Sequence, residues 1–207
     1  MGGGRLSLKL RVATWLAGEG AFVRLLDEVE SQTLAALDAL LRERAPGAAI
    51  GPAVRTAASR RTLAERRAAM TIAQNERVRA LVEALGRDEA IRAGREALFP
   101  AGVRLGTGAR EQLGVGDTDG DLERAARLLY KALGIDFTLE HRADGTMTMH
   151  VHRCALAGHY MPEACEILSA ADEGVVAGLS PKHSMRFEER MTTGNAECRA
   201  RITEAGK

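Results

Sequence analysis

The chain has 207 residues, of which 45% are hydrophobic and 28% are charged, and its 29 basic side chains nearly balance 28 acidic ones. The balanced charge argues against a nucleic-acid or membrane-surface binder, and an aromatic content of 3% argues against base stacking. No apolar run is long enough to cross a membrane, so we expect neither nucleic acid nor a membrane as a partner. Three cysteines without an export signal predict reduced thiols and a cytoplasmic protein.

The first part of the chain is predicted to be helical. Apolar residues recur at intervals of three and four from Gly20 to Arg44, and Pro46 ends this pattern. A second segment, residues 53–85, is rich in the good helix formers alanine, arginine and glutamate and stops at Gly86. Its small apolar residues would suit a helix interface between two copies, so a homodimer is compatible with the sequence.

Two shorter helices are expected next. One, over residues 88–98, is closed by Pro100, and the other, over residues 107–113, lies within a glycine-rich stretch. This stretch lacks both GxGxxG after a strand and GK[ST], so we do not predict a phosphate loop. Asp119 or Asp121 would cap the amphipathic helix that follows.

After Gly134 the apolar period changes from about 3.6 to 2, which predicts strands. Residues 135–139 and 147–151 alternate on either side of an Ala-Asp-Gly turn. A helix over residues 162–179 follows, and then a second strand pair around Gly194. This strand–strand–helix–strand–strand order predicts an α+β fold, in which the N-terminal helices pack on a C-terminal antiparallel sheet.

We also expect a division of the chain into two regions. We expect a helical N-terminal region over residues 1–100 and an α+β domain over residues 101–207, which could together form one continuous domain. Whether the N-terminal helices form a separate unit or cover a site depends on packing that the pattern does not define.

Nucleophilic and metal-ligating side chains are concentrated between His150 and Cys165, in the sequence HVHRCALAGHYMPEAC. Regular alternation would place His150, His152 and Cys154 on one strand face, opposite the apolar residues. Such a polar face either meets solvent or lines a polar cavity. The stretch is therefore the first candidate for a site.

Three further features bear on its chemistry. Cys165 lies near the start of the predicted helix, where the partial positive charge of the backbone favours a thiolate. Asp172 follows two helical turns later and shares the face of Cys165. Cys198 lies on the apolar face of the last strand.

Two chemical interpretations are open. In the first, Cys154, Cys165 and Cys198, with a histidine, hold zinc or an iron–sulfur cluster. In the second, a cysteine is the nucleophile, assisted by a histidine and Asp172. Each cysteine could equally be an ordinary buried residue, since free cysteines are common in protein cores.

The C-terminal pattern consists of LLYKALGIDFTLE, a hairpin, VHRCAL, a helix with Cys165 and Asp172, and FEERMTTGNAECRARI. Over about residues 100–203 it resembles the L-2-amino-thiazoline-4-carboxylic acid hydrolase family. That family is similar in layout to the vinyl-4-reductase domain, a small-molecule-binding α+β module. One departure is Ala155, which stands where many relatives carry a proline.

The resemblance implies hydrolysis of a small cyclic amidine like 2-amino-thiazoline-4-carboxylate. Water or a cysteine attacks the carbon between sulfur and nitrogen, and the ring opens to a carbamoyl-cysteine. Such a reaction needs a nucleophile, an acid/base group and a cation for the substrate carboxylate. The alternatives are a small-molecule-binding or redox- or metal-sensing module without turnover, and an iron–sulfur or zinc protein. Our candidates are Cys154 or Cys165 as nucleophile or metal ligand, His152 or His159 as acid/base, Asp172 as orienting group and Arg153 as carboxylate binder.

Overall fold

The computed structural model describes residues 18–48 and 62–205. Within these ranges helices precede and then flank a four-stranded antiparallel sheet, which confirms the predicted α+β class. No helix in these ranges is long and apolar enough to cross a membrane. The elements are α2 (Glu19–Arg44), α3 (Leu63–Leu85), α4 (Arg87–Leu113), α5 (Asp119–Leu133), β1 (Ile135–His141), β2 (Met147–Cys154), α6 (Pro162–Leu179), β3 (His183–Glu189), the short 3-10 helix η2 (Met191–Thr193) and β4 (Cys198–Glu204).

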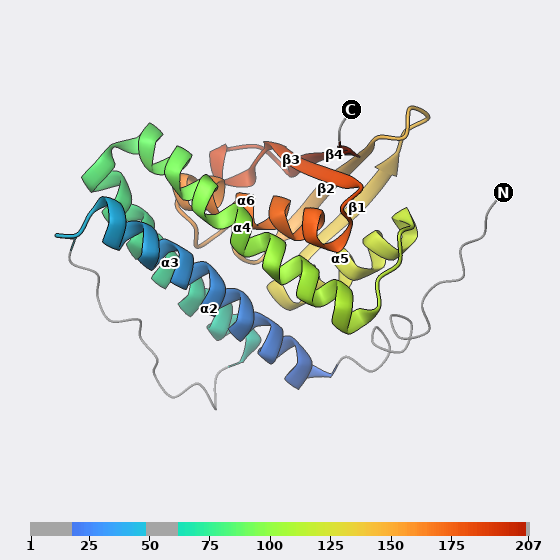
Figure 1. Cartoon of the computed structure of the whole chain (residues 1–207), viewed down its shortest axis with the longest axis horizontal. Helices are drawn as coiled ribbons and strands as arrows, with labels where there is room; N and C mark the ends of the chain where they lie inside the picture. Colours follow the sequence, from blue (N-terminus) through green and yellow to red (C-terminus); the bar gives the residue numbers. More distant parts are fainter. Residues whose placement is uncertain (1–17, 49–61, 206–207) are drawn as a thin grey trace.

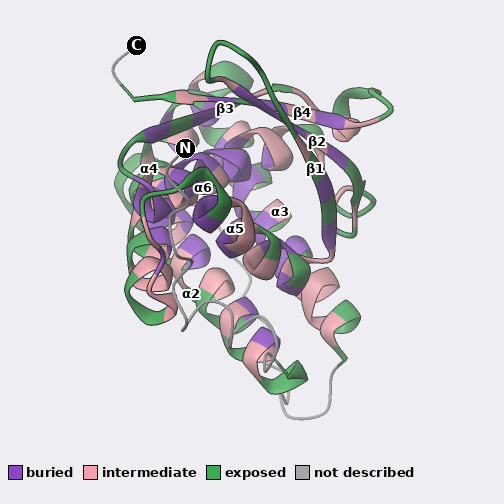
Figure 2. Cartoon of the chain, turned by 90° about the vertical axis from the view of Figure 1, so that its right-hand side faces the viewer, coloured by how far each residue is buried: buried purple, intermediate pink, exposed green. Residues whose placement is uncertain are grey.

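The strands lie in the order β1-β2-β4-β3, and every neighbouring pair is antiparallel. Helices cover one face of the sheet: α5 and α6 pack directly on it, α4 packs against α6, and α2 and α3 lie beyond (Figure 1). Buried residues are concentrated between the sheet and the helices, whereas much of the opposite sheet face is exposed (Figure 2). We call these two sides the inner and the outer face of the sheet.

Several predicted boundaries are confirmed. The helix expected over residues 162–179 is α6, and the turn between the first two strands contains Gly145 with a φ of 82°. The helix expected over residues 53–85 is described from Leu63 onward, and residues 53–61 lie outside the described part of the chain. The predicted homodimer and the expected lack of a nucleic-acid partner stay predictions.

The two short helices expected on either side of Pro100 are wrong, because α4 is continuous from residue 87 to 113. The backbones of α4 and α6 approach closely along a row of glycines. A Cβ atom on Gly102 would lie 2.0 Å from the Ala171 carbonyl oxygen, and one on Gly106 would lie 2.3 Å from the Val175 carbonyl oxygen. The favourable free energy of this close packing offsets the loss of the backbone hydrogen bond that proline removes from a helix. The boundary suggested between residues 100 and 101 falls inside α4.

The helix starts also differ in detail from expectation. Thr118, and neither Asp119 nor Asp121, caps α5, and its hydroxyl accepts a hydrogen bond of 3.1 Å from the Asp121 amide. Asp88 lies in the first turn of α4, whose N-cap is Gly86. Acidic residues in a first helical turn are favoured by the helix dipole, so the sequence signal is similar for either position.

A bulge in β2 decides which way the end of that strand faces. The register of β1 and β2 shifts between Asp136 and Phe137, which leaves His152 as an extra residue in β2. Cys154 is therefore turned to the inner face, whereas His150 and His152 stay on the outer face. The prediction that Cys154 shares a face with the two histidines is wrong, because it assumed regular alternation.

Candidate functional site

A cavity of about 80 Å³ lies beneath the inner face of the sheet, between the sheet, α6 and the helices α2 and α3. This volume is enough for several water molecules. Most of its wall is apolar, with a few polar groups. We call this cavity the chamber and define it by its reactive lining residues, Cys154, Cys165, Cys198, Tyr130, Asp172 and Arg190.

The chamber brings together all three thiols, which are distant in sequence. Cys154 is the last residue of β2, Cys165 lies in the first part of α6, and Cys198 is the first residue of β4. Burial raises the pKa of Cys154 to about 11, and it also raises the pKa values of Cys165 and Cys198. The thiols are therefore protonated at neutral pH. Burial thus acts against the thiolate expected at Cys165.

Asp172 faces the same chamber from the middle of α6. Burial, followed by the charge of Glu173, raises the pKa of Asp172 to about 7, and a hydrogen bond with Tyr130 partly opposes the rise. The Tyr130 ring is held edge-on against Phe137, with a centroid distance of 5.4 Å. Within the described ranges Asp172 has no ion-pair partner, so its carboxyl group can gain and lose a proton near neutral pH.

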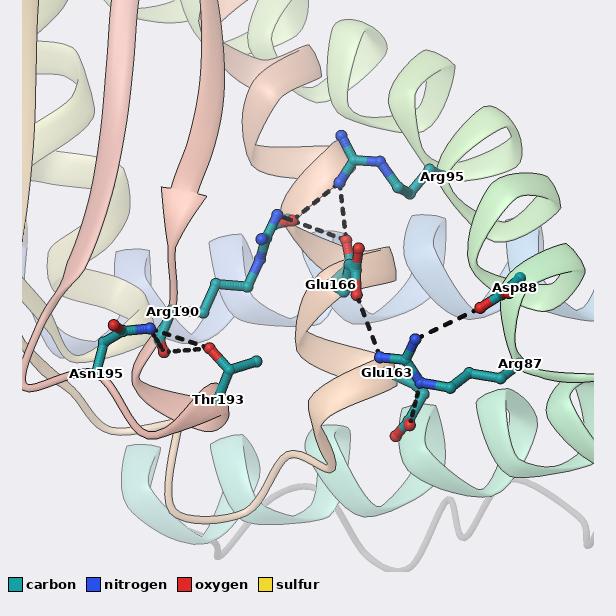
Figure 3. Close-up of polar contacts among 9 residues, drawn as sticks. Arg87, Asp88, Arg95, Glu163, Glu166, Arg190, Thr193 and Asn195 are labelled. Atoms are coloured by element: carbon teal, nitrogen blue, oxygen red, sulfur yellow. Dashed lines mark hydrogen bonds and ion pairs between the residues drawn. The ribbon is translucent and has the colours of Figure 1, made fainter.

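Arg190, just after β3, supplies a cation to the chamber wall. Its Nη2 atom donates a 2.9 Å hydrogen bond to Ser169 Oγ, and its guanidinium lies 5.6 Å from the ring centroid of Phe187. Its Nε atom is buried and has no hydrogen-bond partner in the described part of the chain. Arg95 approaches Ser169 from the opposite side of α6, with a 3.2 Å contact (Figure 3). Arg190 is thus fixed in place while one donor stays unused.

The N-terminal helices contribute the far wall of the chamber. Tyr160 donates a 2.5 Å hydrogen bond to Gln74 Oε1, and Gln74 Nε2 donates a 2.8 Å hydrogen bond to Thr33 Oγ1. Thr33 in turn donates to the Val29 carbonyl oxygen at 2.7 Å. This row joins α2, α3 and the loop before α6, so the chamber depends on helices from both halves of the chain.

The other predicted site residues lie outside the chamber. His152 contacts Thr138 at 2.8 Å and Glu197 at 3.2 Å on the outer face. His159 is exposed in the loop before α6, and Arg153 is exposed and paired with a neighbouring aspartate. The structure therefore brings the cysteines and the aspartate together and separates them from the histidines and the expected carboxylate binder.

The donor set does not support the metal interpretation. Within residues 18–48 and 62–205, no three side chains of histidine, cysteine, aspartate or glutamate form a group that could hold a metal ion. Cys154, Cys165 and Cys198 share a cavity wall, but they do not make a zinc or iron–sulfur ligand set. We derive no reaction step through a metal.

Sequence reasoning missed the groups that complete the chamber. Tyr130 and Arg190 both lie in segments that carry the family resemblance, LLYKALG and FEERMTTG, so the signal was present without a role attached. Gln74 and Thr33 lie in helices without a recognisable motif. Their place in the wall follows from tertiary packing alone.

The solved structures that match this chain include the following three. A trafficking protein particle complex subunit 3 from Naegleria fowleri, covalently bound to palmitic acid, is 12% identical over 67% of this chain and 94% of that chain, with a TM-score of 0.50. The phenol-responsive sensory domain of the transcription activator PoxR with phenol is 19% identical over 67% and 74%, with a TM-score of 0.46. An H-NOX protein from S. oneidensis in the Fe(II)NO ligation state is 14% identical over 87% and 97%, with a TM-score of 0.41. At such identities the first likeness concerns the fold alone.

Comparison of the sequence is more specific. A search of curated proteins finds no match. The family model described as L-2-amino-thiazoline-4-carboxylic acid hydrolase matches residues 63–202, which run from the start of α3 into β4 and include the thiols, Tyr130, Asp172 and Arg190. Because this match covers well over half of the sequence, the chain belongs to the L-2-amino-thiazoline-4-carboxylic acid hydrolase family.

Proposed function

We propose that this protein hydrolyses a small sulfur- and nitrogen-containing heterocycle like 2-amino-thiazoline-4-carboxylate and opens the ring to a carbamoyl-cysteine. One observation carries the proposal: Asp172, a buried carboxyl group whose pKa is raised to about 7, faces a chamber whose wall also holds an arginine with one donor unused among the described residues. Membership of the hydrolase family supports the reaction class.

Asp172 is the proposed general base. As a carboxylate it removes a proton from water, and the water oxygen attacks the ring carbon that is bonded to sulfur and two nitrogens. The tetrahedral intermediate collapses with cleavage of the carbon–sulfur bond, and Asp172 returns the proton to the departing sulfur. The remaining hydroxyl proton passes to the former ring imine nitrogen as the urea carbonyl forms. Water is added overall, and the products are a urea carbonyl and a free thiol. A pKa of about 7 suits both halves of this cycle at neutral pH.

Arg190 is the proposed binder of the substrate carboxylate. Its buried Nε–H has no partner in the described residues, and a carboxylate oxygen would satisfy it with a charge-assisted hydrogen bond. Tyr130 is a positioning residue, because its hydrogen bond with Asp172 orients the carboxyl group. These assignments transfer the acid/base role from His152 or His159 to Asp172, and the carboxylate-binding role from Arg153 to Arg190.

The cysteines have two proposed uses that experiment can separate. With direct attack by water, the protonated thiols form part of the wall. With covalent catalysis, Asp172 first deprotonates Cys165 or Cys154, and the resulting sulfur attacks the ring carbon. The ring carbon–sulfur bond then breaks, its sulfur takes the proton from Asp172, and water releases the urea product and restores the enzyme thiol. Substituting Cys165→Ser and Cys154→Ser in turn distinguishes these routes. Retained turnover in both variants supports attack by water, and abolished turnover in one of them identifies the nucleophile.

The decisive experiment measures thiol release from 2-amino-thiazoline-4-carboxylate. Asp172→Asn is expected to lower kcat by roughly 10²–10⁴-fold, the usual contribution of a general base. Glu166→Gln is the matched control, because Glu166 lies on the same helix and does not line the chamber. A folded Asp172→Asn variant with wild-type turnover would overturn the mechanism. A wild-type protein that binds the heterocycle without releasing a thiol would instead favour the binding-module alternative.

A further inference from the structure

The chamber does not end at Asp172. A second cavity, of about 60 Å³, lies between α2, α4, α5 and α6, and it shares Val29, Tyr130, Leu133 and Asp172 with the chamber wall. Apart from Tyr130 and Asp172, which lie at the junction, its lining residues are all apolar. We call this second cavity the inner channel.

A larger hollow at the surface adjoins the inner channel. This outer groove has a volume of about 560 Å³, lies between α2, α4 and α5, and shares Leu25, Leu105 and Leu129 with the inner channel. Its rim carries charged side chains, including Arg24 and Arg104. The three hollows therefore lie next to one another between the surface and Asp172, and neighbouring hollows share lining residues.

The chemistry of this path is uneven along its length. At one end are a titratable carboxyl group, three thiols and an arginine, and at the other end is a charged rim. The inner channel between them offers a ligand almost nothing but Leu, Val and Ala side chains. Such a passage hydrates poorly, whereas it suits a hydrocarbon chain whose burial is favourable along its whole length.

We propose that the ligands of this protein carry a straight aliphatic tail, which lies in the inner channel and points to the outer groove while the polar head occupies the chamber. The identity of the head rests on the proposed function above. The tail rests on the adjacency of the three hollows and on the apolar walls of the inner channel alone. The substrate class is accordingly an alkyl-substituted sulfur–nitrogen compound.

A series of S-alkylisothioureas, from ethyl to dodecyl, tests this inference. Their head carries the same carbon bonded to sulfur and two nitrogens, and it is a cation that can pair with Asp172. Isothermal titration calorimetry is expected to show affinity that rises about fourfold with each added methylene, until the channel is full. Affinity that is independent of chain length would overturn the proposal.

A variant that narrows the channel separates specific from general hydrophobic binding. Ala126 on α5 is half-buried and lines the inner channel, so Ala126→Leu should remove the gain in affinity for the longer chains. Ala97→Leu is the matched control, because Ala97 is a half-buried helical alanine that lines none of the three hollows. Leu129→Phe obstructs the junction with the outer groove and replaces Ala126→Leu if that variant does not fold. Equal chain-length dependence in the narrowed variant and in the control would overturn the inference.

The Asp172→Asn variant distinguishes failure of the tail inference from failure of the proposed function. It should weaken every member of the series by one common factor, because the cationic head loses its carboxylate partner, and it should leave the increment for each methylene unchanged. Loss of hydrolysis without any chain-length dependence retains the proposed function and overturns the channel. Chain-length dependence without any hydrolysis by the wild-type protein retains the channel and overturns the proposed function.

Discussion

Carboxyl groups lie on both sides of the sheet, but their pKa values are shifted differently on the two sides. On the outer face, contacts with His150 and His152 lower the pKa of Glu197, and His150 contacts it at 2.7 Å. On the inner side, Asp172 is enclosed, and its pKa is raised to about 7. The pKa of a carboxyl group is thus lowered on the outer face and raised on the inner side. Solvent access and the sign of the nearest charge, and not residue type, decide in which direction the pKa of each carboxyl group moves.

The largest expected effect is on turnover. Asp172→Asn should lower kcat by roughly 10²–10⁴-fold, whereas His152→Gln, on the outer face, should leave kcat at the wild-type value because its ring does not reach the chamber. Steady-state thiol release measures both. A large loss in His152→Gln would mean that the outer face takes part in the reaction and would remove the distinction between the faces.

The next effect is on stability. Its dependence on pH is expected to have opposite signs for the carboxyl groups on the two faces. Because the folded state binds the Asp172 proton more tightly than the unfolded chain does, stability should be greatest below the unfolded pKa and fall as pH rises to about 7. The difference between this folded pKa and an unfolded pKa of about 3.9 corresponds to up to about 4 kcal/mol in the free energy of unfolding. Urea unfolding at several pH values between the unfolded and the folded pKa of Asp172 should show this loss of stability in wild type but not in Asp172→Asn.

The opposite pH dependence of stability is expected from Glu197 on the outer face. Since its folded pKa is lowered, its contribution is present above the unfolded pKa and is lost as pH falls through the folded value. Glu197→Gln should therefore reduce stability at neutral pH and converge with wild type in acid. The same urea titrations measure it, and an identical pH dependence for the Glu197→Gln and Asp172→Asn differences would contradict the comparison.

Arginines on the two faces provide a third test. Arg190→Met should raise KM by roughly 10–100-fold, because a hydrogen bond to a charged group contributes about 1.5–3 kcal/mol, with a smaller change in kcat. Arg201→Met is the control, since Arg201 is exposed on the outer face. Kinetics with a substrate analogue that lacks the carboxylate should be equal for wild type and Arg190→Met. A preserved difference with that analogue would show that Arg190 does not bind the carboxylate.

The smallest expected effect concerns the tuning of Asp172. Tyr130→Phe removes the hydrogen bond that opposes the rise in its pKa, so the acidic limb of the kcat profile should move to higher pH. The direction of this movement distinguishes a positioning role from a structural one, because general destabilisation would lower the rate without moving the limb. An unmoved limb would show that Tyr130 does not act on the carboxyl group.

The amino-acid sequence alone determined the elements whose signals are local. The 3.6-residue period predicted α2 and α6, the change to alternation predicted the strands, and the three cysteines and Asp172 were identified as candidates. The family could also be recognised from the sequence, because its pattern extends along contiguous segments. Each of these signals depends on neighbours within a few residues or on residue identity.

Only the tertiary structure decided the chemistry of the site. The bulge at His152 turns Cys154 inward, the glycine contacts with α6 keep α4 continuous through Pro100, and enclosure raises the pKa of Asp172. The role of Arg190 likewise emerges where Ser169 and Phe187 hold it at the chamber wall. Strand register, close backbone approach and solvation depend on atoms that are distant along the chain, and a local sequence pattern cannot express them.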